Sequence, residues 1–330
     1  MINTKHTAYD LIQMQSLPLE IKIRMTKERI RQWYEYWDGQ VYISFSGGKD
    51  STVLKHIVDS MYDDVPAVFV NTGLEYPEIQ KFAMSQKNVI TVRPEMRFDE
   101  VIKKYGYPVV SKEVAQTIWE AKKNVKTGKY AYRIKKLNGE LLDKNGKYSS
   151  YNIPKWKFLL DAPYDISHKC CDVMKKRPAK TYEKTTGRKA IIGTLASEST
   201  LRKTQWIKYG CNAFETKRPT SQPLSFWTEQ DILHYIKQFD VPYCSVYGNI
   251  VPDDEGTLLK TTGCDRTGCI FCMFGCHLEK EPNRFQRLKE THPRQYEYCI
   301  GGGEYVDGKW QPSKEGLGLG KVLDYINVKY

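Results

Sequence analysis

Six consecutive residues, Ser46 to Ser51, have the types and the order that let a backbone loop hold a phosphate group. They read SGGKDS. Gly47 and Gly48 allow a sharp turn and bring backbone N–H groups close to a ligand, because neither carries a Cβ atom. Lys49 adds a full positive charge to the partial charge of a helix that begins here. The pattern predicts an anion cradle for phosphate or pyrophosphate.

A strand and a helix must position this loop. The preceding segment VYISF, residues 41–45, is a run of β-branched and aromatic residues, which predicts a buried strand. The following segment, from Ser51, has the apolar periodicity of a helix. The loop differs from the common GxxxxGK[ST] loop because its glycines are adjacent and Asp50 follows the lysine. A glycine turn that only joins a strand to a helix is the alternative interpretation.

Two further strands are predicted on the N-terminal side of the chain. VPAVFV, residues 65–70, precedes NTGLEYPE, and residues 89–92 form another apolar run. Ligands of open parallel sheets lie at the carboxyl ends of the strands. We therefore expect Thr72 and Gly73 beside the phosphate loop.

A fourth predicted strand, residues 190–192, leads into Gly193. Arg202 follows in the next turn, within GTLASESTLRKTQW. An arginine there can hold the phosphate or sulfate end of a nucleotide through a planar, charge-assisted pair of hydrogen bonds. The segment 223–236 is expected to form a helix capped by Thr228.

Composition limits the classes of protein to consider. The chain has 330 residues, 40% of them hydrophobic, which is enough for one large α/β domain with an appendage or for two domains. It contains no apolar run of 18 residues, and its N-terminus has no apolar signal segment, which predicts a soluble cytoplasmic protein without a membrane partner. The net charge of +12 predicts an acidic partner, and nucleic acid is the stronger form of that inference.

The residues outside the sheet are expected to divide into three parts. Residues 1–40 have the spacing of one or two amphipathic helices. Residues 110–160 are rich in lysine and tyrosine, with a helix from about Ser111 and then a polar hairpin or loop around Asn138-Gly139 and Asn145-Gly146. This insertion is either a solvated extension or a surface for nucleic acid, because lysines meet phosphates and tyrosines stack on bases.

Cysteines provide a second centre of possible chemistry. Cys269 and Cys272 form a CxxC pair, a spacing that directs two sulfurs at one metal ion. Four further thiols lie nearby in the sequence or in a tandem pair: Cys264, Cys276, Cys170 and Cys171. Six thiols thus compete for four positions, and spacing alone does not separate zinc from an iron–sulfur cluster. Buried structural thiols are the alternative.

These motifs together resemble a known family. SFSGGKDS matches the loop of the PP-loop ATP pyrophosphatase superfamily at every characteristic position. The tandem cysteines, the following KKRP, the ASESTLR segment, the PLSFWT helix start and the late CxxC resemble the phosphoadenosine phosphosulfate (PAPS) reductase family over about residues 40–280. The resemblance implies binding of ATP or an adenylyl sulfonucleotide, with Mg²⁺. It implies a nucleotide site that comprises Ser46, Gly47, Gly48, Lys49, Asp50, Ser51, Thr72, Gly73 and Gly193, with Lys49, Asp50 and Arg202 as catalytic residues.

The resemblance also bears on the thiols. In cluster-bearing adenylyl-sulfate reductases of the family, a tandem pair and a later CxxC hold a [4Fe-4S] cluster, which implies Cys170, Cys171, Cys269 and Cys272 as ligands here. In related DNA phosphorothioation sulfurtransferases the ligands lie in the later segment, which would favour Cys264, Cys269, Cys272 and Cys276. The first set is our prediction. The E-C-G-[LI]-H segment that carries the reductases' nucleophilic thiol is not matched, and Cys299 is only a weak counterpart.

We therefore expect a doubly wound α/β fold with a mostly parallel sheet, flanking helices and a C-terminal Cys-rich cluster-binding segment. The expected division is N-terminal helices at 1–40, a nucleotide-binding domain at 41–250 and a Cys-rich segment at 251–330. The predicted function is ATP-dependent adenylation and sulfur transfer onto an acceptor such as nucleic acid. The alternatives are thiol-dependent reduction of a sulfonucleotide and a non-catalytic binding module. Further candidate partners are a sulfur donor protein, a thioredoxin-like thiol and a second copy of the chain.

Overall fold

The computed structural model describes residues 4–330, apart from the side chains of residues 124–127. The first three residues of the predicted N-terminal helical segment thus lie outside the described residues. The chain divides into two compact units. Among the described residues, the first contains 4–71, 75–93 and 178–267, and the second contains 72–74, 94–177 and 268–330. No helix in the described part of the chain is long and apolar enough to cross a membrane.

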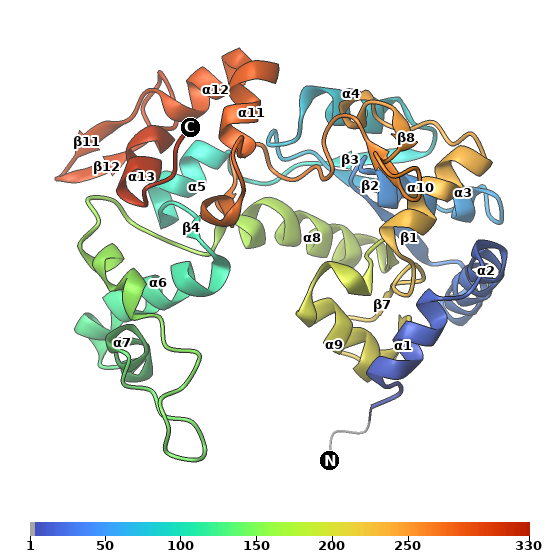
Figure 1. Ribbon diagram of the computed structural model, residues 1–330, viewed down its shortest axis with the longest axis horizontal. Coiled ribbons are helices and arrows are strands. Elements are labelled where there is room, and N and C mark those ends of the chain that lie inside the picture. Colours follow the sequence, from blue (N-terminus) through green and yellow to red (C-terminus); the bar gives the residue numbers. More distant parts are fainter. Residues whose placement is uncertain (1–3) are drawn as a thin grey trace. The chain divides into compact units, whose positions relative to one another are not determined.

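The first unit is built on a six-stranded sheet with the order β3-β2-β1-β5-β7-β6, part of which can be followed in Figure 1. All neighbouring pairs are parallel except β7 with β6. The strands are β1 (Val41–Phe45), β2 (Ala67–Val70), β3 (Val89–Val92), β5 (Lys189–Ile192), β6 (Asn212–Ala213) and β7 (Thr220–Ser221). This architecture confirms the predicted α/β class with a mostly parallel central sheet.

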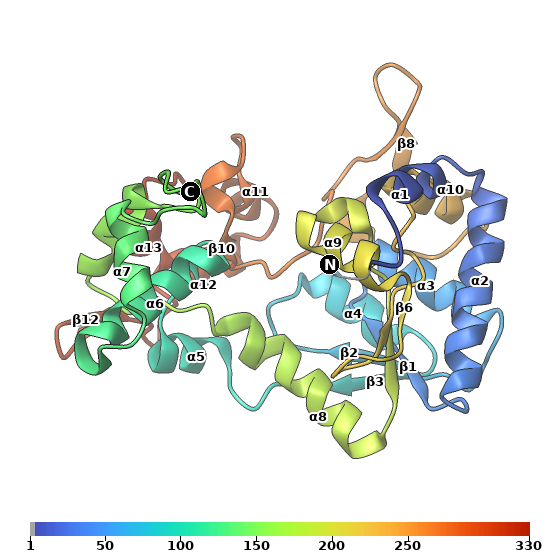
Figure 2. The same cartoon turned by 90° about the horizontal axis from the view of Figure 1, so that it is seen from below.

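Alternation along the strands buries both faces of the sheet. In β1, Val41, Ile43 and Phe45 enter the larger core, whereas Tyr42 enters a second, smaller core. The helices that contribute apolar side chains to the larger core include α2 (Leu19–Tyr36), α3 (Lys49–Asp59) and α10 (Glu229–Gln238). Helix α8 (Arg177–Thr186) contributes Tyr182 to the opposite face, on which it lies in Figure 2. Helices on both faces make the sheet doubly wound.

Local sequence explains where the helices of this unit begin. Thr228 caps α10, since its side chain accepts a hydrogen bond from the Asp231 amide and the Asp231 carboxylate accepts one from the Thr228 amide. The helix starts at Glu229 and not at residue 223 because the segment before the cap forms turns. The remaining helices and strands are α1 (Ala8–Gln15), α4 (Pro77–Ser85), α9 (Thr200–Tyr209), β8 (Ile250–Pro252) and β9 (Leu259–Thr261).

The second unit joins two stretches that the sequence placed in different segments. Strand β4 (Val109–Val110) pairs in parallel with β10 (Met273–Phe274). The buried hydroxyl of Tyr107 donates a 2.8 Å hydrogen bond to the Leu317 carbonyl. Residues 94–177 therefore share a core with residues 268–330, so the units differ in their boundaries from the predicted segments 41–250 and 251–330.

The basic insertion contains more helix than the sequence suggested. Helix α6 (Lys112–Thr127) begins where predicted, but a second helix, α7 (Ala131–Asn138), replaces part of the expected loop. Gly139, at φ +82°, ends this helix, so Asn138-Gly139 is a helix terminus and not a hairpin turn. Asn145-Gly146 does lie in a hairpin, closed by the bridge between Leu142 and Tyr148.

The other elements of the second unit are short. They are α5 (Phe98–Tyr105), the 3-10 helices Pro154–Asp161 and Cys276–Leu278, the π-helix Asp172–Lys176, α11 (Arg284–Thr291), α12 (Pro293–Ile300), β11 (Glu304–Val306), β12 (Lys309–Gln311) and α13 (Leu319–Tyr325).

Candidate nucleotide site and thiol cluster

The phosphate loop lies where the strand order of the sheet reverses. From β1 the chain proceeds to β2 and β3 on one side, and β5 and β7 lie on the other. The crevice beyond such a reversal is the usual ligand site of open α/β sheets. The loop 46–51 follows β1, and Gly193 follows β5. A Cβ atom added to Gly193 would lie 3.0 Å from the Asp50 carbonyl oxygen, so the ends of the two strands meet.

Both glycines of the loop occupy positions that a side chain would disturb. Gly47 has φ +73°, and an added Cβ would lie 3.1 Å from atoms of both Ala83 and Ile79 on α4. Gly48 is the residue before α3, and its added Cβ would lie 3.1 Å from the Tyr247 hydroxyl. The loop backbone is therefore close to its surroundings on two sides, and the positive φ of Gly47 favours glycine at that position.

Two serines fasten the loop to the first turn of α3. The Ser46 and Ser51 hydroxyls are 3.0 Å apart, and Ser51 donates a 2.9 Å hydrogen bond to the Gly48 carbonyl. Thr52 donates to the same carbonyl at 3.0 Å. These hydroxyl groups are engaged in hydrogen bonds that hold the loop in its conformation. The backbone amides and Lys49 are therefore the groups expected to bind phosphate.

Lys49 is a buried cation held by two carboxylates. Its side chain is only 6% exposed, and its ammonium lies 3.1 Å from Glu229 and 3.4 Å from Asp50. Burial alone would lower the pKa of Lys49, but the charges of Asp50 and Glu229 outweigh it and raise that pKa. The lysine is therefore charged at neutral pH, as phosphate neutralisation requires.

Asp50 and Arg202 belong to one electrostatic group. Burial raises the pKa of Asp50, while the Lys49 and Arg266 charges oppose that rise. Burial lowers the pKa of Arg202, the Arg266 charge lowers it further, and the Asp50 charge opposes both. Arg202 and Arg266 both pair with Glu198. The structure thus brings together the three residues predicted to be catalytic, along with a second arginine.

Sequence reasoning missed three side chains at this loop. The Lys49 amide donates a 3.2 Å hydrogen bond to the Tyr247 hydroxyl, which is itself 2.7 Å from the Thr267 hydroxyl. Glu229 reaches Lys49 from the start of α10. Tyr247 is 198 residues from Lys49 in sequence, and no local pattern links the two. For Glu229, the sequence predicted only that a helix capped by Thr228 begins nearby, and not that this residue contacts Lys49.

Two residues predicted for the nucleotide site fall in the second unit. Thr72 and Gly73 follow β2, and the Thr72 hydroxyl accepts a 3.1 Å hydrogen bond from the Leu74 amide. The Leu74 carbonyl accepts a 2.8 Å hydrogen bond from the Ile270 amide, inside the CxxC loop. The segment 72–74 thus packs with the candidate metal-binding loop. Its place in the nucleotide site stays a prediction.

The four preferred thiols lie together in the second unit. The pKa of the Cys170 thiol is raised by its hydrogen bond to Cys171, by burial and by electrostatic interaction with Cys171, Cys269 and Cys272. A hydrogen bond from Cys170, aided by Lys112 and Lys175, lowers the pKa of Cys171 despite its burial. Across the described part of the chain, no three His, Cys, Asp or Glu side chains form a closed metal-binding geometry.

The other two candidate thiols are placed differently. Cys276 is buried, and its thiol donates to the Met273 carbonyl at 3.1 Å. Cys264 belongs to the first unit. The predicted ligand set, which includes the tandem pair Cys170 and Cys171, lies wholly in the second unit. The alternative set does not, because it includes Cys264.

Comparison with known sequences gives the family of the chain. Residues 40–274 match the family described as the phosphoadenosine phosphosulfate reductase domain. The chain belongs to this family. Two uncharacterized proteins of Methanocaldococcus jannaschii are 24% and 23% identical to it over 274 and 293 residues, which are 80% and 86% of this chain. Each match covers 48% of the relative, so the chain spans about half the length of the curated relatives it matches.

Three solved structures are among those similar to this chain. A phosphoadenylyl-sulfate reductase from Candida auris, in a phosphate complex, is 15% identical with a TM-score of 0.37, over 72% of this chain and 90% of that one. The FMN adenylyltransferase of Candida glabrata with ATP is 13% identical with a TM-score of 0.38, over 72% and 65%. The U34-tRNA thiolase NcsA of Methanococcus maripaludis, with its [4Fe-4S] cluster, is 15% identical with a TM-score of 0.30, over 68% and 66%.

This member of the PAPS reductase family differs from the reductase pattern at its late cysteine. Cys299 is fully buried in α12, and burial raises the pKa of its thiol. A nucleophilic thiol needs access to its substrate and a thiolate form at neutral pH. Cys299 has neither in this structure.

Proposed function

We propose that the chain binds ATP at the loop 46–51 and transfers its adenylyl group to an acceptor oxygen, which sulfur then replaces. The observation that carries the proposal is the buried, charged Lys49 in a glycine loop at the reversal point of the sheet. Loop amides and the lysine would hold the phosphates, and Arg202 would stabilise the charge that develops on them.

The reaction has two steps. An acceptor oxygen attacks the α phosphorus, the bond from that phosphorus to the α–β bridging oxygen breaks, and pyrophosphate leaves with the electron pair. Hydrosulfide from a sulfur donor then attacks the carbon that carries the adenylated oxygen. The carbon–oxygen bond breaks, AMP leaves, and a proton is released as sulfur takes the place of oxygen.

Two groups that the family resemblance implies fit the residues present. The Asp50 carboxylate lies at the phosphate loop with one oxygen 3.4 Å from the Lys49 ammonium, and carboxylate oxygen is a ligand that Mg²⁺ prefers. Cys170, Cys171, Cys269 and Cys272 supply the thiolate donors that an iron–sulfur cluster requires, and they interact with one another. When bound, such a cluster would supply iron sites with affinity for sulfur.

Product analysis tests the proposal. The protein is incubated with ATP and Mg²⁺, with candidate acceptors, and separately with adenylyl sulfate and its 3′-phosphorylated form. Pyrophosphate release that Lys49→Ala abolishes supports adenylation. Sulfite release from a sulfonucleotide would instead establish the reductase alternative. Nucleotide binding without either product would establish a non-catalytic module.

A further inference from the structure

Positive charge is concentrated in one part of the second unit. Residues 94–177 contain 19 lysine and arginine residues against 10 aspartate and glutamate residues, whereas residues 268–330 contain 9 against 8. Most of the net charge of +12 therefore comes from the stretch that includes α6, α7 and the hairpin. A concentration of this kind marks where a polyanion is attracted.

Exposed aromatic side chains accompany this charge. Tyr148 is 79% exposed, Tyr151 is 72% exposed and Tyr132 is 47% exposed. Cations lie over several of these rings: Arg133 is 4.4 Å from the Tyr132 ring centre and Lys136 is 5.9 Å from that of Tyr151. Exposed rings accompanied by cations are the side chains on which unpaired bases stack.

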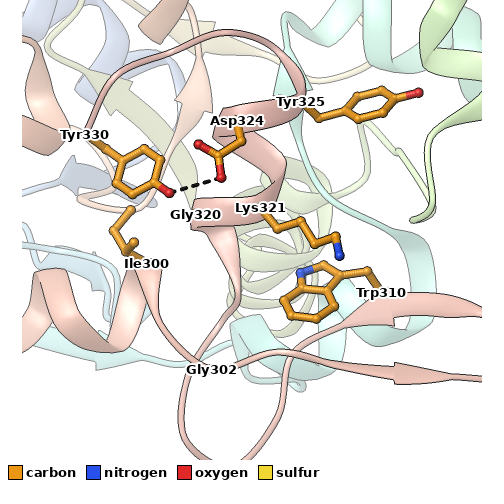
Figure 3. Close-up of a pocket in the computed structure, with 8 residues that line it drawn as sticks. All are labelled: Ile300, Gly302, Trp310, Gly320, Lys321, Asp324, Tyr325 and Tyr330. Atoms are coloured by element: carbon orange, nitrogen blue, oxygen red, sulfur yellow. Dashed lines mark hydrogen bonds between the residues drawn. The ribbon is translucent and has the colours of Figure 1, made fainter.

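An open pocket lies in the same unit. Its volume is about 680 Å³, and Trp310, Lys321, Asp324, Tyr325 and Tyr330 are among its lining residues. Figure 3 shows Lys321 beside the Trp310 ring, and the Tyr330 hydroxyl facing the Asp324 carboxylate at 3.2 Å. The Lys321 ammonium lies 4.7 Å from the Trp310 ring centre and 4.5 Å from that of Tyr305. The pocket thus combines stacking faces, a cation and a hydrogen-bond acceptor.

Aromatic contacts connect the pocket to the basic stretch. The Phe158 ring centre is 5.6 Å from that of Tyr325, a lining residue, and 6.1 Å from that of Trp156. Lys155 lies over Trp156 at 5.0 Å. Phe158 is 40% exposed. A row of rings with flanking lysines therefore runs from the 3-10 helix Pro154–Asp161 to the pocket.

The side chains of this surface favour an unpaired nucleic-acid strand over a duplex or an anionic membrane. Bases inside a duplex hide their faces, so a row of exposed rings has partners only in an unpaired strand. A membrane would accept the lysines and the rings but would make no use of a carboxylate inside the pocket. Asp324 can accept a hydrogen bond from an exocyclic amino group, as carboxylates do from cytosine N4.

We propose that this surface binds single-stranded nucleic acid and that the pocket seats one unstacked base bearing an amino group. The claim that this nucleic acid is the sulfur acceptor rests on the proposed function. The claim that the surface binds nucleic acid does not. Lys321 neutralises a backbone phosphate, Tyr305 and Phe158 stack on bases, and Asp324 accepts from the amino group of the seated base.

Fluorescence anisotropy without ATP tests the binding. Labelled single-stranded oligo(dC) and oligo(dT), an oligo(C) RNA strand, a duplex and anionic vesicles are titrated with the full chain. We expect single strands to bind more tightly than the duplex, and oligo(dC) more tightly than oligo(dT). Tyr305→Ala and Phe158→Ala should each weaken binding about fivefold or more. Lys321→Glu should also weaken it and reduce the salt dependence by about one phosphate contact.

Matched controls come from the first unit. Tyr9, 66% exposed on α1, and Lys237, exposed on α10, give Tyr9→Ala and Lys237→Glu, which should leave the affinity unchanged. Asp324→Asn should reduce the preference for oligo(dC). Equal affinity for single strand and duplex, stronger binding to vesicles, or insensitivity to the Tyr305 and Phe158 variants would overturn the inference. If the binding test fails but the protein still releases pyrophosphate from ATP, the inference about nucleic acid is wrong and the proposed adenylation is still supported.

Discussion

The Lys49 ammonium lies 3.1 Å from the Glu229 carboxylate, which reaches it from the first residue of α10. Asp50 supplies a second carboxylate at 3.4 Å. A buried ammonium needs such neighbours to stay charged. Glu229 is 54% exposed, whereas Asp50 is 23% exposed, so Glu229 is the carboxylate that an incoming phosphate can replace most easily.

Lys49→Ala should abolish adenylation. Removing the one lysine of the loop deletes a charge from the place where phosphate charge develops, and such losses lower kcat by about a hundredfold or more. Pyrophosphate release measures the effect. Lys55→Ala is the matched control, because Lys55 is equally buried on the same helix and pairs with Asp59 at 2.5 Å, away from the loop. Equal loss of activity in both variants, with folding intact, would contradict the role of Lys49.

Glu229→Gln should tighten ATP binding. The substitution removes a negative charge that competes with phosphate for Lys49, and two charges about 4 Å apart in a water-like environment interact by about 1 kcal/mol, or about fivefold in affinity. Calorimetric titration with a non-hydrolysable ATP analogue gives the dissociation constant. Glu215→Gln, an exposed carboxylate change in the same unit, should leave it unchanged. Weaker binding in the Glu229 variant would contradict this prediction, because it would show that the Glu229 carboxylate helps to bind the nucleotide and does not compete with its phosphates for Lys49.

The cluster ligands can be separated by substitution. Anaerobically purified protein should be brown and contain about four irons per chain. Cys171→Ala and Cys272→Ala should lose the colour and the iron, whereas Cys299→Ala and Cys244→Ala should keep both. Loss of iron in Cys264→Ala and Cys276→Ala, with retention in Cys171→Ala, would favour the alternative ligand set. Stoichiometric zinc in a colourless sample would exclude the cluster.

His56 should make the protein less stable in acid. Burial lowers the pKa of His56 below its ordinary value of 6.5, and its ring lies 2.9 Å from the Tyr235 hydroxyl. The unfolded chain therefore binds more protons at this site, so the free energy of unfolding falls as pH drops through 6.5 toward the folded-state pKa. Burial moves the pKa of His6 in the same direction. Urea unfolding at pH 5, 6 and 7 should show this slope, and His56→Gln should make it shallower. Superimposable slopes would refute the assignment.

The core of the nucleotide site follows from local sequence. The strand, the glycine loop and the helix start at residues 41–54 are continuous, so their order alone predicts the cradle. Gly193 entered the predicted site through the family resemblance, and its closeness to Asp50 agrees with parallel strands that end at the same edge of a sheet. Thr228 signalled its helix through the capping pattern.

The missed features depend on contacts between distant parts of the chain. Tyr247 and Glu229 reach Lys49 only after the sheet and α10 have packed. Strands β4 and β10 have two residues each, too few for any periodic pattern, so the union of residues 94–177 with 268–330 had no sequence signal. The sequence predicts a polar hairpin or loop where the structure has helix α7, because the pair Asn138-Gly139 can end a helix as well as form a hairpin turn.

A crystal structure with a non-hydrolysable ATP analogue and Mg²⁺ tests the central claim most directly. The account predicts phosphate oxygens within hydrogen-bond distance of the amides of Gly47, Gly48 and Lys49, with the Tyr247 hydroxyl displaced from the Lys49 amide. A nucleotide bound elsewhere, or a loop that keeps its contact with Tyr247 while the nucleotide is present, would contradict it.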